Sequence, residues 1–260
     1  MKNISNTVVI TGGLGGIGIE LVYFFYKKNY NVIILDNKKI DYFNNLKINK
    51  IKKKNFIIYR KINLVNSQLV KKLFINLIKN YNKIDVLINC AGIQYVSKIE
   101  NLPDHKWNEI ININLSSVFY TIKNILPTMK KNNWGRIINI SSVHGLVASI
   151  DKSAYVASKH GIIGLTKTIA LETAILPITV NAICPGWVDT PLVSKQIQDQ
   201  IKVNKSNKDI ETKKLLISKH PNLKFIPGKA IASLAFYLCS EEASEITGAS
   251  INIDGGWISQ

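Results

Sequence analysis

Short apolar runs alternate with longer amphipathic stretches along most of the chain. The short runs are rich in Ile and Val, and their unbroken apolar character is typical of strands that are buried on both faces of a parallel sheet. We expect strands at residues 7–11, 31–36, 55–62, 84–89, 135–140, 178–184 and 249–253. Helical spacing between them predicts helices at residues 16–28, 67–81, 104–130, 154–173 and 228–240. This alternation indicates an α/β fold, a doubly wound Rossmann-type parallel sheet of about seven strands with helices on both faces.

One segment interrupts the alternation. Residues 188–226 are polar, rich in Lys and Gln, and have the spacing of one or two short helices. Because the segment follows the end of a strand, we expect it to form a small substrate lid; a surface excursion without function is the alternative. No other change in composition divides the chain, so residues 1–260 are expected to form a single domain.

Composition is that of an ordinary globular protein, with 46% hydrophobic and 20% charged residues in 260. No apolar run approaches the roughly 18 residues of a membrane span, so no membrane association is expected. The first residues lead directly into the first expected strand, so no signal peptide is expected. The three cysteines, Cys90, Cys184 and Cys239, fit neither a disulfide framework nor a metal site, and a cytoplasmic location is the simplest expectation.

The formal net charge of +17 raises the question of a nucleic-acid partner. The basic residues are mostly lysines among Asn and Ile, as in 47–55 and 202–214, and arginine occurs only at Arg60 and Arg136. Arginine is the residue suited to bidentate base and phosphate recognition. The charge therefore indicates compositional bias, and no nucleic-acid partner is expected.

A glycine cluster follows the first expected strand and opens the first helix. Gly12 suits a tight turn, Gly16 a close approach of backbone to phosphate, and Gly18 close packing of helix on strand. The spacing differs from the usual dinucleotide fingerprint and is only moderately specific. Asp36 ends the second strand, where a carboxylate accepts hydrogen bonds from ribose hydroxyls and repels a 2′-phosphate, which favours NAD over NADP.

Tyr155 and Lys159 are four residues apart in an expected helix, so their side chains lie on one face. A neighbouring ammonium favours the phenolate and lowers the pKa of a tyrosine, which makes it a general base for an alcohol. Alone, this pair is more often a solvated helix face. Together with Ser142 and the glycine cluster, it predicts hydride-transfer chemistry.

These motifs resemble the short-chain dehydrogenase/reductase family over essentially the whole chain. The resemblance rests on residues 11–18, 89–92, 114, 142, 155, 159 and 185–186. It implies that the catalytic residues are Asn114, Ser142, Tyr155 and Lys159. It implies that the cofactor is bound by Thr11, Gly12, Gly16, Ile17, Gly18, Asp36, Asn63, Leu64, Asn89, Ala91, Gly92, Tyr155, Lys159, Pro185, Gly186, Val188 and Thr190. The family also implies a homotetramer that packs through the helices around 104–130 and 154–173.

Several further blocks resemble a bacterial branch of this family that oxidises (R)-3-hydroxybutyrate to acetoacetate with NAD. They are residues 91–94, 144–149, 152–155, 181–188, 190–193, 195–197 and 254–257. The resemblance implies that the substrate, a small hydroxy or keto acid, is bound by Gln94, Ser142, His144, Lys152, Tyr155, Trp187, Gln196 and Trp257. A small anion needs one firm cation, here Lys152, and neutral donors that orient it.

Two positions depart from the family pattern. Asn63 stands where the family often has an aspartate near the adenine, and Cys90 replaces the second asparagine of an Asn-Asn-Ala-Gly motif. Two other functions stay open at this point. A 3-oxoacyl carrier-protein reductase has the same fold, although Asp36 disfavours NADPH, and a catalytically silent NADH-binding scaffold would keep the cofactor cleft alone.

Overall fold

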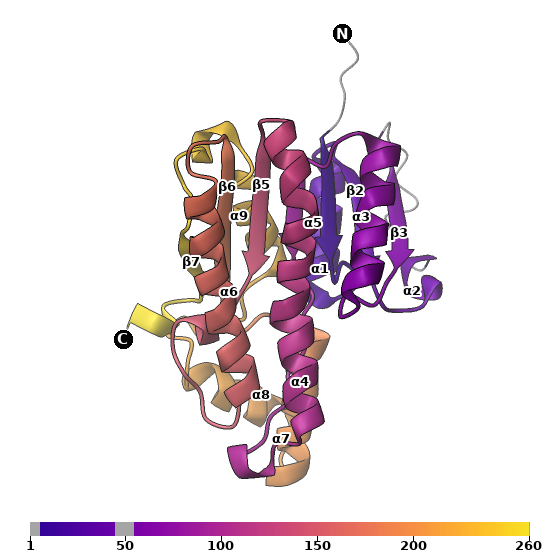
Figure 1. Cartoon of the computed structure of the whole chain (residues 1–260). Helices are drawn as coiled ribbons and strands as arrows, with labels where there is room; N and C mark the ends of the chain where they lie inside the picture. Colours follow the sequence, from indigo (N-terminus) through magenta and orange to yellow (C-terminus); the bar gives the residue numbers. More distant parts are fainter. Residues whose placement is uncertain (1–5, 45–54, 260) are drawn as a thin grey trace.

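The computed structural model of the protein describes residues 6–44 and 55–259 (Figure 1). The lysine-rich stretch 47–55, apart from Asn55, lies outside the described residues, as do residues 1–5 and 260. No helix of the described part is both long and apolar enough to span a lipid bilayer.

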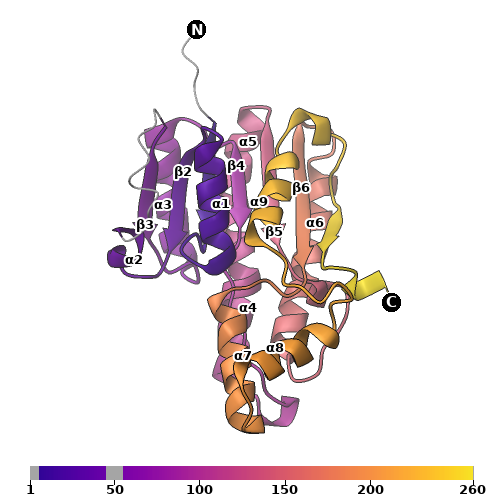
Figure 2. The same cartoon turned by 180° about the vertical axis from the view of Figure 1, so that it is seen from behind.

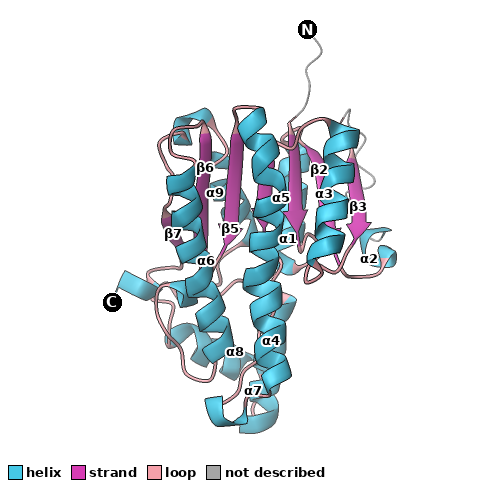
Figure 3. Cartoon of the chain, in the orientation of Figure 1, coloured by secondary structure: helices cyan, strands magenta, loops and turns pink. Residues whose placement is uncertain are grey.

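A parallel sheet of seven strands forms the centre of the described chain, in the order β3-β2-β1-β4-β5-β6-β7 (Figure 3). The strands are β1 (Thr7–Thr11), β2 (Asn31–Asp36), β3 (Ile57–Lys61), β4 (Val86–Asn89), β5 (Gly135–Ile140), β6 (Ile178–Pro185) and β7 (Ser250–Ile253). The chain crosses from β3 back to β4 beside β1, so the order reverses between β1 and β4. A ligand crevice is expected outside the carboxyl ends of the strands at such a reversal.

Helices cover both faces of this sheet, as the pattern predicts. α1 (Gly16–Lys27) and α9 (Gly228–Tyr237) lie on one face, which Figure 2 shows. α3 (Ser67–Tyr81), α5 (Ser117–Lys131) and α6 (Ser153–Glu172) lie on the other, which Figure 1 shows. The prediction of a doubly wound α/β fold is confirmed.

The unbroken apolar strands explain this arrangement. Side chains alternate between the two faces of a strand, so Val8 and Ile10 pack with α1 and α9, while Val9 packs with α3 and α5. All five residues of β1 are buried. The inner strands β1, β2, β4 and β5 thus supply apolar side chains to two cores, whereas the edge strand β7 supplies Ile251 and Ile253 to one core only.

The expected helix at 104–130 is interrupted. α4 (Asp104–Ile111) passes through one π-helical turn, Asn112–Ser116, before α5 begins. Single π-helical turns inside longer helices often occur at functional sites. A short helix that the pattern did not predict, α2 (Ile40–Asn44), follows β2.

The segment 188–226 contains α7 (Pro191–Asn204) and α8 (Lys208–Ile217). Val188 and Ile226 form an isolated parallel β-bridge, which brings the two ends of the segment together. Both views place α7 and α8 beyond the carboxyl ends of the strands (Figures 1 and 2). The segment therefore lies at the edge of the sheet where the strand order reverses.

Candidate active site

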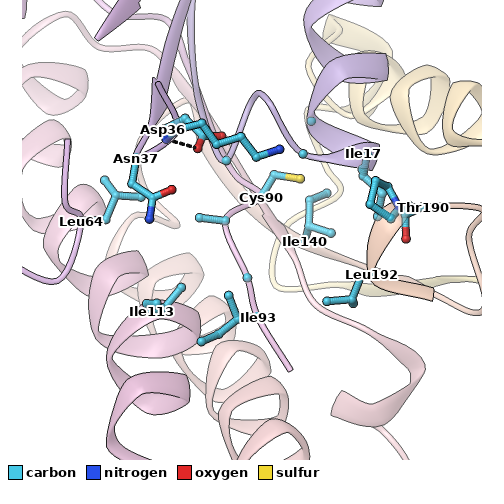
Figure 4. A pocket seen from close by; sticks show the side chains of 18 of the residues that line it. Ile17, Asp36, Asn37, Leu64, Cys90, Ile93, Ile113, Ile140, Thr190 and Leu192 are labelled. Carbon is cyan, nitrogen blue, oxygen red and sulfur yellow. Dashed lines mark hydrogen bonds between the residues drawn. The ribbon is translucent and has the colours of Figure 1, made fainter. Parts of the chain in front are cut away.

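A cleft of about 480 Å³ opens at the carboxyl edge of the sheet between the ends of β1, β2 and β4. Figure 4 shows Asp36 and Asn37 at one end of the cleft and Ile17 and Thr190 at the other. Most of the residues predicted to bind the cofactor line it: Gly12, Gly16, Ile17, Gly18, Asp36, Asn63, Leu64, Ala91, Gly92, Tyr155, Lys159 and Thr190.

The glycines at the head of α1 differ in what they accommodate. Gly12 has φ +63°, and a Cβ there would lie 2.6 Å from Cα of Ala91, so the turn and the neighbouring strand end both require glycine. A Cβ on Gly18 would lie 2.1 Å from the carbonyl oxygen of Gly12, as expected for close packing of helix on strand. The space beside Gly16 is filled by Thr190 at 2.5 Å, so here the glycine makes room for residue 190 and the start of α7.

Asp36 lies at the end of the cleft with its carboxylate buried. Its Oδ2 accepts a hydrogen bond from the backbone N–H of Leu14 (3.0 Å), and its Oδ1 accepts one from the backbone N–H of Lys38 (3.1 Å). The Lys38 ammonium donates to the carbonyl of Leu14 at 2.6 Å. Asp36 and Lys38 together therefore hold the glycine-rich turn in place, a role that the sequence did not indicate.

Five predicted cofactor residues do not line this cleft. Thr11 and Asn89 lie behind its wall. Thr11 Oγ1 accepts hydrogen bonds from the backbone N–H groups of Cys90 (3.0 Å) and Ala91 (3.2 Å), which joins the ends of β1 and β4. Asn89 bonds Asn139 and Thr121 in a buried polar network. The remaining three, Pro185, Gly186 and Val188, line a smaller adjoining cavity.

This second cavity, of about 70 Å³, adjoins the cleft along shared wall residues that include Tyr155, Thr190 and Leu192. Its walls contain most of the residues predicted to bind the substrate: Gln94, Ser142, His144, Tyr155, Trp187 and Trp257. The predicted cofactor and substrate residues thus meet at Tyr155.

Ser142 and Tyr155 face this junction from two elements. Ser142 follows β5, and its Oγ accepts a hydrogen bond from the backbone N–H of His144 at 3.1 Å. With one acceptor position occupied in this way, the Ser142 hydroxyl proton is free to point toward another oxygen. Tyr155 lies in the first turn of α6, and Lys159 follows one turn later with its ammonium 5.5 Å from the tyrosine ring centroid.

The electrostatics of this pair differ from the prediction. Burial raises the pKa of Tyr155 to about 12, and the Ser142 side chain opposes the rise only in part. Burial also lowers the pKa of Lys159 to about 8. The Lys159 ammonium donates a hydrogen bond to the carbonyl of Ile140 (2.8 Å), and the cost of burying a phenolate dominates the pKa of Tyr155 in this arrangement. Tyr155 is therefore a neutral phenol here.

Asn114 lies in the π-helical turn and is completely buried. Its Oδ1 accepts a hydrogen bond from the N–H of Ile93 (2.9 Å), and its Nδ2 donates to the carbonyl of Ile93 (3.0 Å) and to Ser158 (3.1 Å). Both ends of the amide thus hold the loop that follows β4. The extra residue of the π turn gives Asn114 the position from which it reaches that loop and α6 together.

His144 and Lys152 lie beside two tryptophan rings. The ring centroid of His144 is 5.2 Å from that of Trp257 and 6.3 Å from those of Trp187 and Tyr155. Burial, assisted by the charge of Lys152, lowers the pKa of His144 to about 4, and the Val147 backbone opposes this shift in part. His144 is therefore a neutral imidazole with one donor available.

Lys152 is 5% exposed, and its ammonium lies 4.6 Å from the ring centroid of Trp187. Burial lowers the pKa of Lys152 to about 8, with a further contribution from the charge of Lys219. The ion pairs found in residues 6–44 and 55–259 do not include Lys152. A buried cation without a carboxylate partner is costly unless it meets an anion.

The two predicted glutamines meet across the mouth of this region. Gln94 Nε2 donates to Gln196 Oε1 at 3.1 Å, although 102 positions separate them in the chain. Gln94 lies after β4 and Gln196 in α7, so the contact joins the segment 188–226 to the sheet. Gln196 and Lys152 do not line either cavity directly, and each touches a residue that does.

His220 is a residue of this region that sequence reasoning missed. It is fully buried, its Nε2 accepts a hydrogen bond from the backbone N–H of Trp187 (2.8 Å), and its Nδ1 lies 2.7 Å from the carbonyl of Lys224. Since Nε2 accepts, Nδ1 carries the proton. His220 therefore fixes the end of the segment 188–226 to the residue after β6, and its position in a lysine-rich stretch gave no signal of this.

Other wall residues of the cleft were also missed. Cys90, Ile93, Ile113, Ile140 and Ser141 line it from strand ends and from the π turn. For Cys90, Ile140 and Ser141 the available signal was their position at the carboxyl ends of predicted strands, and Ile113 in the π turn had no such signal. The described residues contain no group of three His, Cys, Asp or Glu side chains that could hold a metal ion.

Comparison with known proteins gives a consistent result. The sequence model of the short chain dehydrogenase family matches residues 6–201. The chain is 41% identical over 257 residues to a D-beta-hydroxybutyrate dehydrogenase of Rhizobium meliloti, covering 98% of this chain and 100% of that protein. It is 50% identical over 176 residues to the enzyme of the same name from Cupriavidus necator, covering 68% of each chain.

The solved structures include the aldohexose dehydrogenase of Thermoplasma acidophilum in ligand-free form. It superposes with a TM-score of 0.86 at 33% identity, covering 98% of this chain and 95% of the other. Sequence and fold agree over nearly the whole length. The chain therefore belongs to the short-chain dehydrogenase/reductase family of oxidoreductases.

Proposed function

We propose that the protein interconverts (R)-3-hydroxybutyrate and acetoacetate with NAD as cofactor. The observation that carries this proposal is Lys152, a buried ammonium beside the predicted catalytic residues with no carboxylate partner among the described residues. A small anionic substrate supplies the missing charge. The two relatives named D-beta-hydroxybutyrate dehydrogenase support the same substrate class.

The residues of the larger cleft fit a nicotinamide dinucleotide. The head of α1 presents backbone N–H groups where a pyrophosphate would be held, and Gly12 and Gly18 have no room for a side chain. Asp36 lies at the end of β2, where its carboxylate would receive ribose hydroxyls and disfavour a 2′-phosphate. A nicotinamide held by these residues would supply the hydride acceptor for oxidation of the hydroxy acid and the hydride donor for reduction of the ketone.

The substrate carboxylate would be held by Lys152 and oriented by neutral donors. The neutral His144 ring has one N–H donor, and the buried indole N–H of Trp187 is a second donor, which has no partner among the described residues. Buried polar groups normally have hydrogen-bond partners, and a carboxylate has acceptors for each of these donors. Gln94 and Gln196 would also bind the substrate carboxylate, once the hydrogen bond between their side chains is replaced by hydrogen bonds to that anion.

Tyr155 and Ser142 would act on the oxygen at C3. In reduction, the neutral phenol of Tyr155 donates its proton to the keto oxygen, and in oxidation the same atom takes the proton of the alcohol. Ser142 donates a hydrogen bond to that oxygen and orients it. Lys159 lowers the cost of the phenolate once its ammonium turns from the Ile140 carbonyl toward the ring. Holding the carboxylate places C3 at this pair, so binding energy is used for orientation.

The segment 188–226 would act as a substrate lid, because it contributes residues to both cavities. Thr190 and Leu192 line the cleft and the smaller cavity together, and Gln196 bonds Gln94 from α7. Closure of such a segment excludes water from the reacting atoms.

The test is formation of NADH by the purified protein with (R)-3-hydroxybutyrate, compared with NADP⁺ and with the (S) enantiomer. We expect NAD⁺-dependent turnover that is selective for the (R) enantiomer. Reduction of a 3-oxoacyl thioester with NADPH in its place would identify a carrier-protein reductase. Tight NADH binding without turnover of either substrate would identify a non-catalytic scaffold.

A further inference from the structure

A second lysine approaches the aromatic wall of the substrate cavity. Lys219 follows α8 at the end of the segment 188–226, and its ammonium lies 5.8 Å from the ring centroid of Trp257. The rings of Trp257 and Trp187 are 5.4 Å apart, and Lys152 lies over Trp187. Two lysines from different elements therefore contact the same pair of tryptophans, from the start of α6 and from the end of the lid.

Neither of these two lysines forms an ion pair with a carboxylate of the described residues. The ion pairs seen across the described chain involve Lys83, Lys106, Arg136 and Lys214 only. The positive charge of Lys219 contributes to the lowered pKa of Lys152 and to that of His144. Lys219 is exposed, so solvent relieves much of its own charge, whereas the buried Lys152 depends on an anion. An anion between the tryptophan pair and the lid relieves the repulsion between both lysines.

Lys219 is held in this position by its neighbour. His220 is bonded to the backbone of Trp187 and lies near the carbonyl of Lys224, and its ring centroid is 5.7 Å from that of Trp257. Because the adjacent residue is fixed to the cavity wall, the Lys219 backbone is fixed as well. The Lys219 backbone is thus anchored beside the tryptophan pair, while its side chain stays exposed at the edge of the cavity.

We propose that Lys219 is a second cationic residue of the substrate site, which draws the carboxylate into the cavity from the lid side and sets a preference for anionic over neutral substrates. This inference rests on the proposed function for the identity of the substrate. In this proposal the lid recognises the negative charge of the substrate through Lys219. Gln196, the other lid residue proposed to bind the substrate carboxylate, is neutral and does not supply a charge. The segment 188–226 carries eight lysines and four acidic residues, which adds to an attractive field for anions.

The test compares Lys219→Gln with Lys219→Arg and with Lys213→Gln. Lys213 is an exposed lysine of α8, so Lys213→Gln makes the same change of net charge on the same segment. Tryptophan fluorescence titration with acetoacetate and with its neutral methyl ester measures binding without turnover. For Lys219→Gln we expect acetoacetate to bind about fivefold more weakly, the size expected of an exposed charge pair, and the ester to bind as in the parent.

Steady-state kinetics gives the second measurement. Lys219→Gln should raise KM for (R)-3-hydroxybutyrate by about fivefold with kcat little changed, and Lys219→Arg should restore the parent KM. Equal losses for the acid and the ester, or equal losses in Lys219→Gln and Lys213→Gln, would overturn the proposal. If the parent protein fails to turn over the hydroxy acid, the proposed function fails. The fluorescence titration with acetoacetate and its ester then decides about Lys219 alone.

Discussion

Replacing Lys152 by methionine should stabilise the protein while removing its grip on the substrate. Burial lowers the pKa of Lys152 from its ordinary value of 10.5 to about 8. Since one pH unit corresponds to about 1.4 kcal/mol, carrying this charge in the folded state at pH 7 costs up to about 3 kcal/mol. Loss of the contact with Trp187 offsets about 1 kcal/mol of the gain. A methionine side chain of similar length fills the same space, so we expect a net gain of about 2 kcal/mol.

The pH dependence of this gain has a defined sign. Between pH 8 and pH 10.5 the folded protein carries a neutral Lys152, whereas the unfolded chain still binds the proton there. Stability rises with pH wherever the unfolded state binds more protons, so the wild type gains stability across this window. Lys152→Met lacks the group and does not share this gain. The difference in the free energy of unfolding between Lys152→Met and the wild type should therefore have its largest value at pH 7 and vanish near pH 10.5.

Urea unfolding at a series of pH values between 7 and 10.5 measures this difference, with thermal unfolding as a second assay. A gain of about 2 kcal/mol raises the Tm of a chain of this size by about 5 °C. Lys213→Met, at an exposed lysine of α8, serves as the control and should leave the Tm unchanged. The reasoning would be refuted by a Lys152→Met protein no more stable than the wild type at pH 7, or by a gain that stays constant up to pH 10.5.

Three further predictions concern the catalytic pair, the substrate charge and the glycine-rich turn. Tyr155→Phe should lower turnover by about 10²- to 10⁴-fold and leave NADH binding, measured by fluorescence, unchanged; near-normal turnover would contradict the proposed proton transfer. The kcat/KM for acetoacetate reduction should fall above about pH 8, where Lys152 loses its proton, more steeply than that for the methyl ester, and Lys152→Arg should move this limb to higher pH. Gly18→Ala should cost about 3 kcal/mol in urea unfolding, because its Cβ would lie 2.1 Å from the Gly12 carbonyl oxygen. Gly164→Ala, where nothing lies within 4 Å of the added Cβ, should be neutral or stabilising, so an equal loss in both would contradict the packing argument.

The sheet could be predicted from sequence because its strands are buried on both faces. Such strands read as short unbroken apolar runs, and β1, β2 and β5 begin and end at the predicted residues. β3 begins two residues later than predicted, at Ile57, because an edge strand has fewer neighbours to define its ends. The order of the strands follows from the fold class, and the pattern alone does not contain it.

The π-helical turn could not be predicted, because one extra residue in a long helix leaves the apolar spacing on either side intact. Only the tertiary structure reveals that Asn114 uses this turn to hold Ile93 by both ends of its amide. Asn89 illustrates the same limit at a strand end. The prediction placed it in the cofactor site, but side chains alternate along β4, so Asn89 turns into the buried network with Thr121, and Cys90 lines the cleft.

The electrostatics of Tyr155 were the least predictable part of the site. Spacing alone places an ammonium beside the phenol, and it suggests a lowered pKa. Burial acts on both groups in the opposite sense, and the structure shows that burial dominates, with the pKa of Tyr155 raised to about 12. Desolvation depends on everything packed around a residue, which no local motif encodes.

The distribution of charge along the two cavities connects the proposed cofactor to the proposed substrate. Asp36 is the one acidic residue among the described residues that line either cavity, and Figure 4 shows it at the opposite end of the cleft from Ile17 and Thr190, which line both cavities. Lys152 and Lys219 lie at the tryptophan pair beyond the junction at Tyr155. Under the proposed function, a phosphate on the ribose would meet the Asp36 carboxylate, with the Lys38 ammonium beside it, and a free carboxylate would meet the ammonium groups of Lys152 and Lys219. We therefore propose that Asp36 disfavours NADP at one end, with Lys38 opposing this effect, and that the two lysines favour a small anionic acid at the other. A thioester of a carrier protein has no such anion to place between the lysines, so its binding would leave Lys152 buried without a partner.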